Sequence, residues 1–213
     1  MVRVLITGVN RGIGRALAGE AAERGFDVTG TTRSGQDGTI ALELSDVTGI
    51  KTALDGIGPV DILINNAGVI GPDRQSPLDM DFEGFAETLH INTLAPLAVA
   101  QAVLPGLRQS NAPKILTISS QMAFMGYRKA DRIAYRASKA AVNKVMQGLA
   151  TMLEPDGIPV ALVDPGWVRT DMGGAGADES PDVVARGILD IADRLSLADT
   201  GKFFCFTGEE RAF

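Results

Sequence analysis

A glycine-rich loop, T-G-V-N-R-G-I-G at residues 7–14, constrains the fold of this chain more than any other feature. It follows an apolar, β-branched run and precedes a stretch with helical spacing, which is the order that a phosphate-binding loop requires. Gly8 permits a tight turn, Gly12 lets the backbone approach a pyrophosphate, and Gly14 allows helix and strand to pack closely. The helix start adds free N–H groups for the anion. The alternative, an ordinary glycine turn, does not explain why strand, loop and helix follow in this order.

Short apolar runs recur along the chain and predict about seven strands, at residues 2–7, 27–32, 40–44, 62–65, 114–119, 160–163 and 202–206. Helical spacing predicts helices at residues 13–24, 84–108, 134–154 and 181–195. Apolar strands that alternate with helices favour an α/β fold, a doubly wound parallel sheet with helices on both faces. In such sheets, ligands bind at the carboxyl ends of the strands.

The whole chain, residues 1–213, is expected to form one domain. Its hydrophobic content of 45% suffices for a sheet buried between two helical layers, and no linker or repeat interrupts it. The glycine-rich stretch at residues 173–178 lies between a proline turn and a predicted helix. We therefore interpret the region near residues 172–180 as a short, mobile substrate flap.

Charge and cysteine content limit the partners. With 20 Lys and Arg against 26 Asp and Glu, the net charge of −6 gives no attraction to nucleic acid or anionic membranes, and we expect neither partner. The single cysteine, Cys205, can form neither an internal disulfide nor a thiolate cluster, and we expect no metal site. No export signal or membrane span is visible, so we expect a cytoplasmic protein.

Tyr135 and Lys139 lie four residues apart in Y-R-A-S-K, so on a helix their side chains share one face. A tyrosine must release a proton from a pKa near ~10, and a neighbouring ammonium lowers that pKa by favouring the phenolate. The pair predicts a proton donor with a helper lysine. Taken alone, it fits equally well an amphipathic tyrosine beside a lysine that extends to solvent.

Three motifs in order, the loop at residues 7–14, N-N-A-G at residues 65–68 and Y-R-A-S-K at residues 135–139, resemble those of the short-chain dehydrogenase/reductase family. The resemblance covers nearly the whole chain. It is greatest to the small carbonyl-reductase-like group that includes the sniffer enzymes and the bacterial C-signal proteins. It implies a single-domain Rossmann fold in which Tyr135 protonates a carbonyl oxygen as hydride arrives from the cofactor, while Lys139 also holds the nicotinamide ribose.

The family pattern implies two further catalytic residues. Ser120 ends the apolar run I-L-T-I-S-S at a strand's carboxyl end, where its hydroxyl could hold the substrate oxygen, and Ser119 is the competing assignment. Asn92, in H-I-N-T-L, matches an asparagine that kinks its helix and fixes a proton-relay water, and asparagine is a poor residue for mid-helix. His90 points elsewhere on that helix, and we interpret it as a structural or surface group.

The remaining cofactor contacts also follow from the resemblance. Asp46 and Val47 resemble an adenine-edge pair, although an acidic loop residue is more often simply solvated. The segment D-P-G-W-V-R-T-D-M resembles a turn that offers groups to the nicotinamide carboxamide, and Trp167 within it is interpreted as core filler. The predicted contact set is Gly8, Asn10, Arg11, Gly12, Ile13, Gly14, Arg33, Asp46, Val47, Asn66, Ala67, Gly68, Tyr135, Lys139, Pro165, Gly166, Val168 and Thr170.

The cofactor is predicted to be NADP(H) rather than NAD(H). Arg33 follows the second strand, where an NAD enzyme carries an acidic residue, and Arg11 lies in the glycine loop. Guanidinium groups suit the oxygens of a 2′-phosphate. The alternative is that both arginines are merely solvated.

The predicted function is NADPH-dependent reduction of a ketone or aldehyde to an alcohol, or the reverse, with a homodimer implied by the resemblance alone. The short flap predicts an open and fairly apolar pocket near Met122, Phe124 and Met125, although these side chains fit a core equally well. The charged loop at residues 128–132 is either a rim beside the substrate or a solvated cluster. The alternative function is a dinucleotide-binding signalling protein that acts through a partner.

Overall fold

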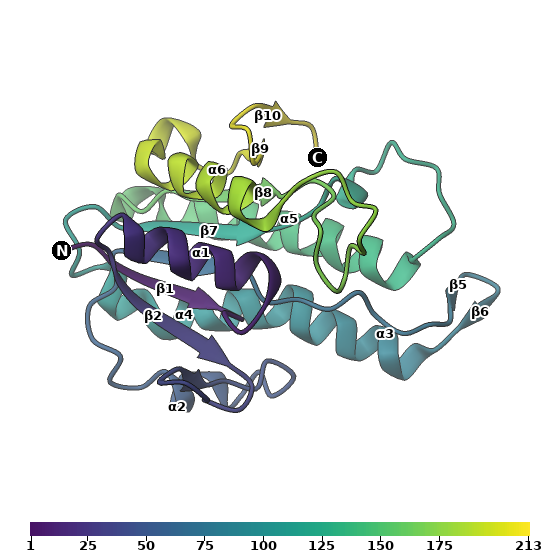
Figure 1. Cartoon of the computed structure of the whole chain (residues 1–213), viewed down its shortest axis with the longest axis horizontal. Coiled ribbons are helices and arrows are strands. Elements are labelled where there is room, and N and C mark those ends of the chain that lie inside the picture. Colours follow the sequence, from purple (N-terminus) through teal and green to yellow (C-terminus); the bar gives the residue numbers. More distant parts are fainter.

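The computed structural model describes all residues from 1 to 213 and centres on an eight-stranded sheet (Figure 1). The strands run in the order β10-β9-β8-β7-β4-β1-β2-β3. Their bounds are β1 (Arg3–Thr7), β2 (Asp27–Thr32), β3 (Ile40–Ala41), β4 (Ile62–Asn65), β7 (Lys114–Ile118), β8 (Val160–Asp164), β9 (Phe203–Cys205) and β10 (Glu210–Arg211). All pair in parallel except β10, which is antiparallel to β9. The predicted α/β fold is confirmed, and β10 is an added edge strand.

Helices cover both faces of this sheet because its strands are apolar on both sides. Alternate residues of β1 face opposite ways: Ile6 packs with α1 (Gly12–Glu23) and α6 (Pro181–Arg194), whereas Leu5 packs with α4 (Ala95–Leu107) and α5 (Ile133–Leu153). The short helix α2 (Ile50–Ala53) joins the second layer. Strand order reverses between β1 and β4, so their carboxyl ends form the switch point where ligands of such sheets bind.

The helix predicted at residues 84–108 is interrupted. It is α3 (Phe82–Leu89), a π-helical turn at His90–Leu94 and then α4. The turn contains Asn92, and Pro96 just beyond it has no N–H to donate to the Asn92 carbonyl in the regular i to i−4 pattern. The irregularity of this helix at Asn92 is a π-helical turn, and Pro96 gives it a backbone cause.

Two smaller features were not predicted. Residues 75–80 form a hairpin of β5 (Gln75–Ser76) and β6 (Asp79–Met80), and three-residue turns of 3-10 helix occur at Gln121–Ala123, Glu154–Asp156 and Leu197–Asp199. Residues 42–44, predicted to continue the third strand, lie beyond its two paired residues. No helix in the structure combines the length and the apolar character needed to span a bilayer.

Candidate active site

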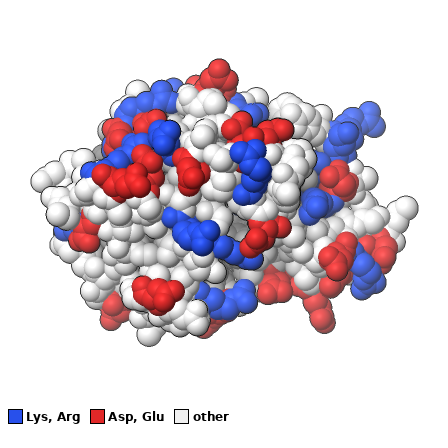
Figure 2. All heavy atoms as spheres, in the orientation of Figure 1, with Lys and Arg blue, Asp and Glu red and all other residues white.

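One cavity of about 890 Å³ opens at the carboxyl ends of the parallel strands. Its wall includes the glycine loop, the end of β4, the end of β7, the start of α5 and the turn after β8. Lys and Arg side chains alternate with Asp and Glu on the face shown in Figure 2, and neither sign gathers into one patch. The site is thus a local cavity rather than part of a broad charged surface.

The glycine loop is shaped for close approach of a ligand to its backbone. Gly8 and Gly12 have φ values of +75° and +54°, which side chains other than glycine rarely adopt. A β-carbon on Gly14 would collide with the carbonyl oxygen of Gly8. The Thr7 hydroxyl accepts hydrogen bonds from the backbone N–H groups of Asn66 and Ala67, at 3.0 and 3.1 Å. The loop is thereby tied to the end of β4, and this cradle fits a dinucleotide phosphate.

Both predicted phosphate-binding arginines line the cavity, and each is paired with a carboxylate. Arg11 lies 3.1 Å from Asp171, and Arg33 lies 3.2 Å from Glu43. All four side chains are substantially exposed, so these surface pairs are weak and open to exchange with another anion.

Asp46 and Val47 do not line the cavity, whose wall in this region is formed by residues 42–44. The Asp46 carboxylate instead accepts hydrogen bonds from the Thr48 hydroxyl and the Gly49 N–H, at 2.8 and 3.0 Å. These bonds hold the pKa of Asp46 below its ordinary value. Asp46 thus caps the turn before α2, and the adenine-edge role stays a prediction. Sequence reasoning missed the cavity-lining role of residues 42–44 because they were expected inside a strand.

Ser120, Tyr135 and Lys139 are buried and line the same cavity. Ser120 comes directly after β7, whereas Tyr135 and Lys139 stand one turn apart on α5. The Lys139 Nζ donates a hydrogen bond of 2.8 Å to the Ile118 carbonyl and lies 5.8 Å from the centre of the Tyr135 ring. The pair is therefore fixed against the end of β7, beside the serine.

Burial dominates the acidity of this pair. It raises the pKa of Tyr135 to about 12, and the Ser120 hydroxyl opposes that shift only in part. Burial also lowers the pKa of Lys139 to about 8. The sequence predicted the opposite direction for the tyrosine, because it considered the ammonium and not the loss of water around the phenol.

The two serines differ in their partners. The Ser119 hydroxyl is hydrogen-bonded to the Asn143 side chain of α5, deep in the protein. Ser120 accepts a bond of 3.1 Å from the N–H of Met122, and its hydroxyl interacts with the Tyr135 phenol inside the cavity. Because Ser119 is committed elsewhere, the geometry favours Ser120 as the group that meets a ligand.

Asn92 lies behind the cavity wall rather than on it. Its side chain accepts from the N–H of Val69 at 2.9 Å and donates to the Val69 carbonyl at 2.8 Å. It also donates to the hydroxyl of Ser138, next to Lys139, at 3.0 Å. The side chain thus joins the loop after β4 to α5, and the water expected at Asn92 stays a prediction.

The turn after β8 supplies another wall. Pro165, Gly166, Val168 and Thr170, which the motif predicts to contact the cofactor, line the cavity. Trp167 was expected in the core, but it is 50% exposed and lines the cavity, with its indole N–H bonded to the Gly173 carbonyl at 2.8 Å. Its position is set by the flap that it contacts, which no local pattern in the sequence reveals.

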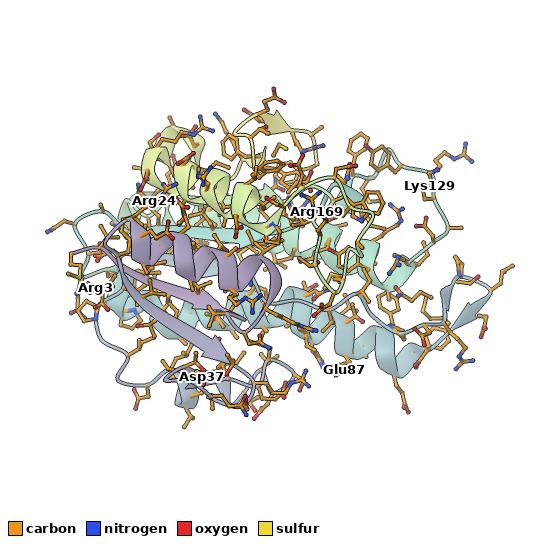
Figure 3. All side chains as sticks on the ribbon, in the orientation of Figure 1. Arg3, Arg24, Asp37, Glu87, Lys129 and Arg169 are labelled. Atoms are coloured by element: carbon orange, nitrogen blue, oxygen red, sulfur yellow. The ribbon has the colours of Figure 1, made fainter.

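The flap itself is tied down at its far end. Arg169, labelled in Figure 3, donates hydrogen bonds to the carbonyls of Ala177 and Asp178, at 3.0 and 2.6 Å. Met172 and Gly173 of the flap line the cavity. These contacts close residues 168–179 into a loop over one side of the site.

The charged loop before α5 divides into two parts. Asp131 and Arg132 line the cavity, whereas Arg128 and Lys129 do not, and Figure 3 shows Lys129 at the outer edge of the molecule. Of the three apolar candidates, Met122 lines the cavity, Phe124 packs edge-on against Tyr127, and Met125 is exposed. His90 is exposed and lies outside the cavity wall, and Cys205 is buried.

A parallel sheet whose glycine loop and buried Ser-Tyr-Lys group face one cavity defines an NAD(P)-dependent oxidoreductase. Residues 2–180 match the model of the short chain dehydrogenase family. The chain therefore belongs to the short-chain dehydrogenase/reductase family and is an oxidoreductase that acts on CH–OH or carbonyl groups.

Relatives and solved structures agree with this assignment. The chain is 43% identical to C-signal of Myxococcus xanthus over 155 residues, 72% of this chain and 92% of that protein. It is 33% identical to the 3-oxoacyl-(acyl-carrier-protein) reductase FabG of Vibrio harveyi, over 79% of this chain and 74% of that protein. The NADPH-bound carbonyl reductase from chicken fatty liver matches with a TM-score of 0.88 and 28% identity, over 99% and 98% of the two chains. The carbonyl reductase Sniffer of D. melanogaster shares the fold, with a TM-score of 0.92 at 24% identity over the full length of both.

Proposed function

We propose that this protein uses NADPH to reduce a ketone or aldehyde to an alcohol, with Tyr135 as the proton donor. The observation that carries the proposal is the meeting of Ser120, Tyr135 and Lys139 in the cavity that also exposes the glycine loop. The reductase names of FabG and of the chicken and fly enzymes support the reductive direction.

A bound nicotinamide supplies the hydride for such a reduction. The residues of this chain hold the substrate and move the proton. The Ser120 hydroxyl orients the carbonyl oxygen, and the Tyr135 phenol donates its proton to that oxygen as negative charge develops there. A pKa of Tyr135 raised to about 12 keeps the phenol protonated at neutral pH, which suits a donor better than an acceptor. Lys139 holds the ribose of the cofactor, and the backbone of Asn92 holds a water that returns the proton.

The preference for NADPH rests on Arg11 and Arg33, which line the cavity. A 2′-phosphate would replace Asp171 and Glu43 as their partners, and its oxygens can accept paired donors from guanidinium. Several structural neighbours were crystallised with NADP or NADPH. The remaining contacts that we propose for the dinucleotide are Gly8, Asn10, Gly12, Ile13, Gly14, Asn66, Ala67, Gly68, Pro165, Gly166, Val168 and Thr170, all of them on the cavity wall.

The proposal is tested by NADPH oxidation with a panel of ketones and aldehydes, comparing the wild type with Tyr135→Phe. Loss of a general acid is expected to lower kcat by about 10²–10⁴-fold while NADPH binding, measured by its fluorescence, is kept. Tyr127→Phe is the matched control, because Tyr127 is the only other tyrosine and lies outside the cavity wall. A Tyr135→Phe enzyme as fast as the wild type would refute the donor role. A wild type that binds NADPH but reduces no carbonyl would favour a signalling protein instead.

Cofactor preference has its own test. Arg33→Ala should weaken NADPH binding by about tenfold, the loss of one charge-assisted contact, and leave the Kd of NADH unchanged. Arg15→Ala, at an exposed arginine outside the cavity wall, should leave both constants unchanged. Tighter binding of NADH than of NADPH by the wild type would contradict the assignment.

A further inference from the structure

Asp164, the last residue of β8, is a carboxylate with no exposed surface. A buried charge is stable only with partners that replace its water. Its Oδ1 accepts hydrogen bonds from the backbone N–H groups of Gln121 and Gly166, at 3.0 and 3.1 Å. Its Oδ2 lies 2.9 Å from Nε of Arg211 in an ion pair, and neither of these two atoms has a hydrogen-bond partner. The carboxylate thus has backbone donors on Oδ1 and a cation beside Oδ2.

The two backbone partners belong to two neighbouring segments of the cavity wall, which follow the adjacent strands β7 and β8. Gln121 follows Ser120 at the end of β7, and Gly166 forms the turn after β8, and both line the cavity. One carboxylate oxygen therefore links the segment that carries Ser120 to the segment that carries Pro165 and Gly166. If this oxygen moves, both segments lose a hydrogen bond at once.

Arg211 comes from a distant part of the chain and touches no part of the cavity. It lies on β10, the edge strand that pairs with β9 near the C-terminus (Figure 1). Its side chain also donates to the sulfur of Cys205 at 3.7 Å. The titratable groups that face Asp164 and Arg211 are Tyr135, Tyr127 and Cys205.

We propose that Arg211 is a positioning residue for the active site: it holds the buried Asp164 carboxylate in place, and that carboxylate sets the Ser120 and Gly166 segments. The inference rests on the role of Ser120 and Tyr135 proposed above. Without the guanidinium, Asp164 is a buried carboxylate with no cation beside it, and it is expected to turn away from its present position. Such a movement changes the bonds from Oδ1 to the cavity wall.

Electrostatics add to this effect. The negative charge of Asp164 raises the pKa of Tyr135, although less than burial does. Arg211 offsets that charge with an opposite one at close range. Removal of Arg211 is therefore expected to shift the cavity-wall segments and to change the electrostatic potential at the Tyr135 phenol. Arg211 itself lines no part of the cavity.

The experiment compares kcat and KM for the best carbonyl substrate in four variants: Arg211→Met, Arg211→Lys, Asp164→Asn and the double variant of Arg211→Met with Asp164→Asn. All rates are corrected for the folded fraction, measured by thermal unfolding. We expect Arg211→Met to lower kcat by about 10- to 100-fold, the cost of small displacements in an active site, and Arg211→Lys to restore most of it. Asp164→Asn removes the charge but keeps an oxygen acceptor. When Asp164 is already asparagine, adding Arg211→Met should change kcat less than about twofold. The effects of the two substitutions are then non-additive, because Arg211 acts on the site only through the Asp164 carboxylate.

Arg194→Met is the matched control, because Arg194 also anchors the C-terminal segment, through a 2.8 Å bond to the Gly208 carbonyl, and forms no ion pair with Asp164. An equal loss of kcat in Arg194→Met would show that any loosening of this segment suffices, and would overturn the inference. The inference would also be overturned if Arg211→Met lowered kcat by the same factor in the Asp164→Asn protein as in the wild type. If Arg211→Met matches the wild type while Tyr135→Phe is inactive, only this inference fails. If the wild type reduces no carbonyl, the proposed function fails first.

Discussion

Replacing Lys139 with methionine should make the ligand-free protein more stable at neutral pH while lowering its activity. Lys139 is 4% exposed, and its amine has a carbonyl as its one hydrogen-bond partner and no carboxylate within salt-bridge distance. Keeping a charged amine there costs free energy that an apolar side chain of similar length avoids. The lysine is therefore retained at the expense of stability, which is typical of catalytic groups.

The magnitude follows from the pKa. A fall from 10.5 to about 8 in the folded protein corresponds to roughly 3 kcal/mol against the charged form. Removing the amine also removes a hydrogen bond from a charged donor, worth about 2 kcal/mol. Lys139→Met should thus raise the free energy of unfolding by about 1 kcal/mol at pH 7.

The sign should reverse at alkaline pH. Below pH 8 the lysine is charged in both the folded and the unfolded states, so the wild type bears the full burial cost. Between pH 8 and 10.5 the folded state releases the proton first, the cost fades, and the wild type gains stability relative to the variant. By pH 10 only the lost hydrogen bond should remain as the main difference, leaving Lys139→Met less stable by about 1 kcal/mol.

Urea unfolding at pH 7 and pH 10 measures this difference. The measurements are made without dinucleotide, because a ligand that binds the native state would itself raise the free energy of unfolding. Titration of Tyr135 affects both proteins and largely cancels. Lys144→Met is the control, since Lys144 is exposed on the same helix and bears no burial cost. A Lys139→Met protein that is destabilised equally at both pH values would refute the argument that burial of this charge opposes folding.

Three further changes test other parts of the site and fold. Gly14→Ala should abolish dinucleotide binding in a titration of NADPH fluorescence, because its β-carbon would collide with a carbonyl of the glycine loop. Gln75→Leu should lower kcat more than it raises KM in steady-state kinetics, because the buried Gln75 accepts a 3.2 Å bond from the N–H of Tyr135 and so orients the start of α5. Asp61→Asn should lower the free energy of unfolding, measured in urea titrations, by about 1–3 kcal/mol at pH 7 and by much less at pH 2. The Arg3 guanidinium holds the pKa of Asp61 far below its ordinary value, and the stability that this pair contributes is lost as pH falls through the acidic range.

Local patterns were enough for the sheet and most of the site. β-branched runs marked the parallel strands, and their alternation with helices dictated the layers. The four-residue spacing of Tyr135 and Lys139 placed both on one face of α5, and the position of Ser120 after an apolar run placed it at the same edge. These features are encoded by neighbours in the chain, so one sequence reveals them.

Features that depend on how neighbouring segments pack, or on burial by the whole fold, could not be read in this way. Strand β10 has two residues and exists because it pairs with β9, and Trp167 lines the cavity because it contacts the flap. The direction of the Tyr135 pKa shift was also missed, because burial of the phenol is a property of the whole fold. Spacing places a side chain on a face but does not say how much water remains around it.

Asp164 and Arg211 extend this argument to a pair of residues that no short motif contains. An acidic residue directly before the Pro165–Gly166 turn is buried by the sheet itself, so it needs a cation from outside the local segment. The C-terminal strand β10 is where this chain supplies one. We therefore expect the two positions to vary together among homologous sequences, with a neutral residue at 164 wherever the residue at 211 is uncharged. An alignment in which acidic residues at 164 commonly face apolar residues at 211, with no other cation beside them, would contradict the coupling on which the positioning role depends.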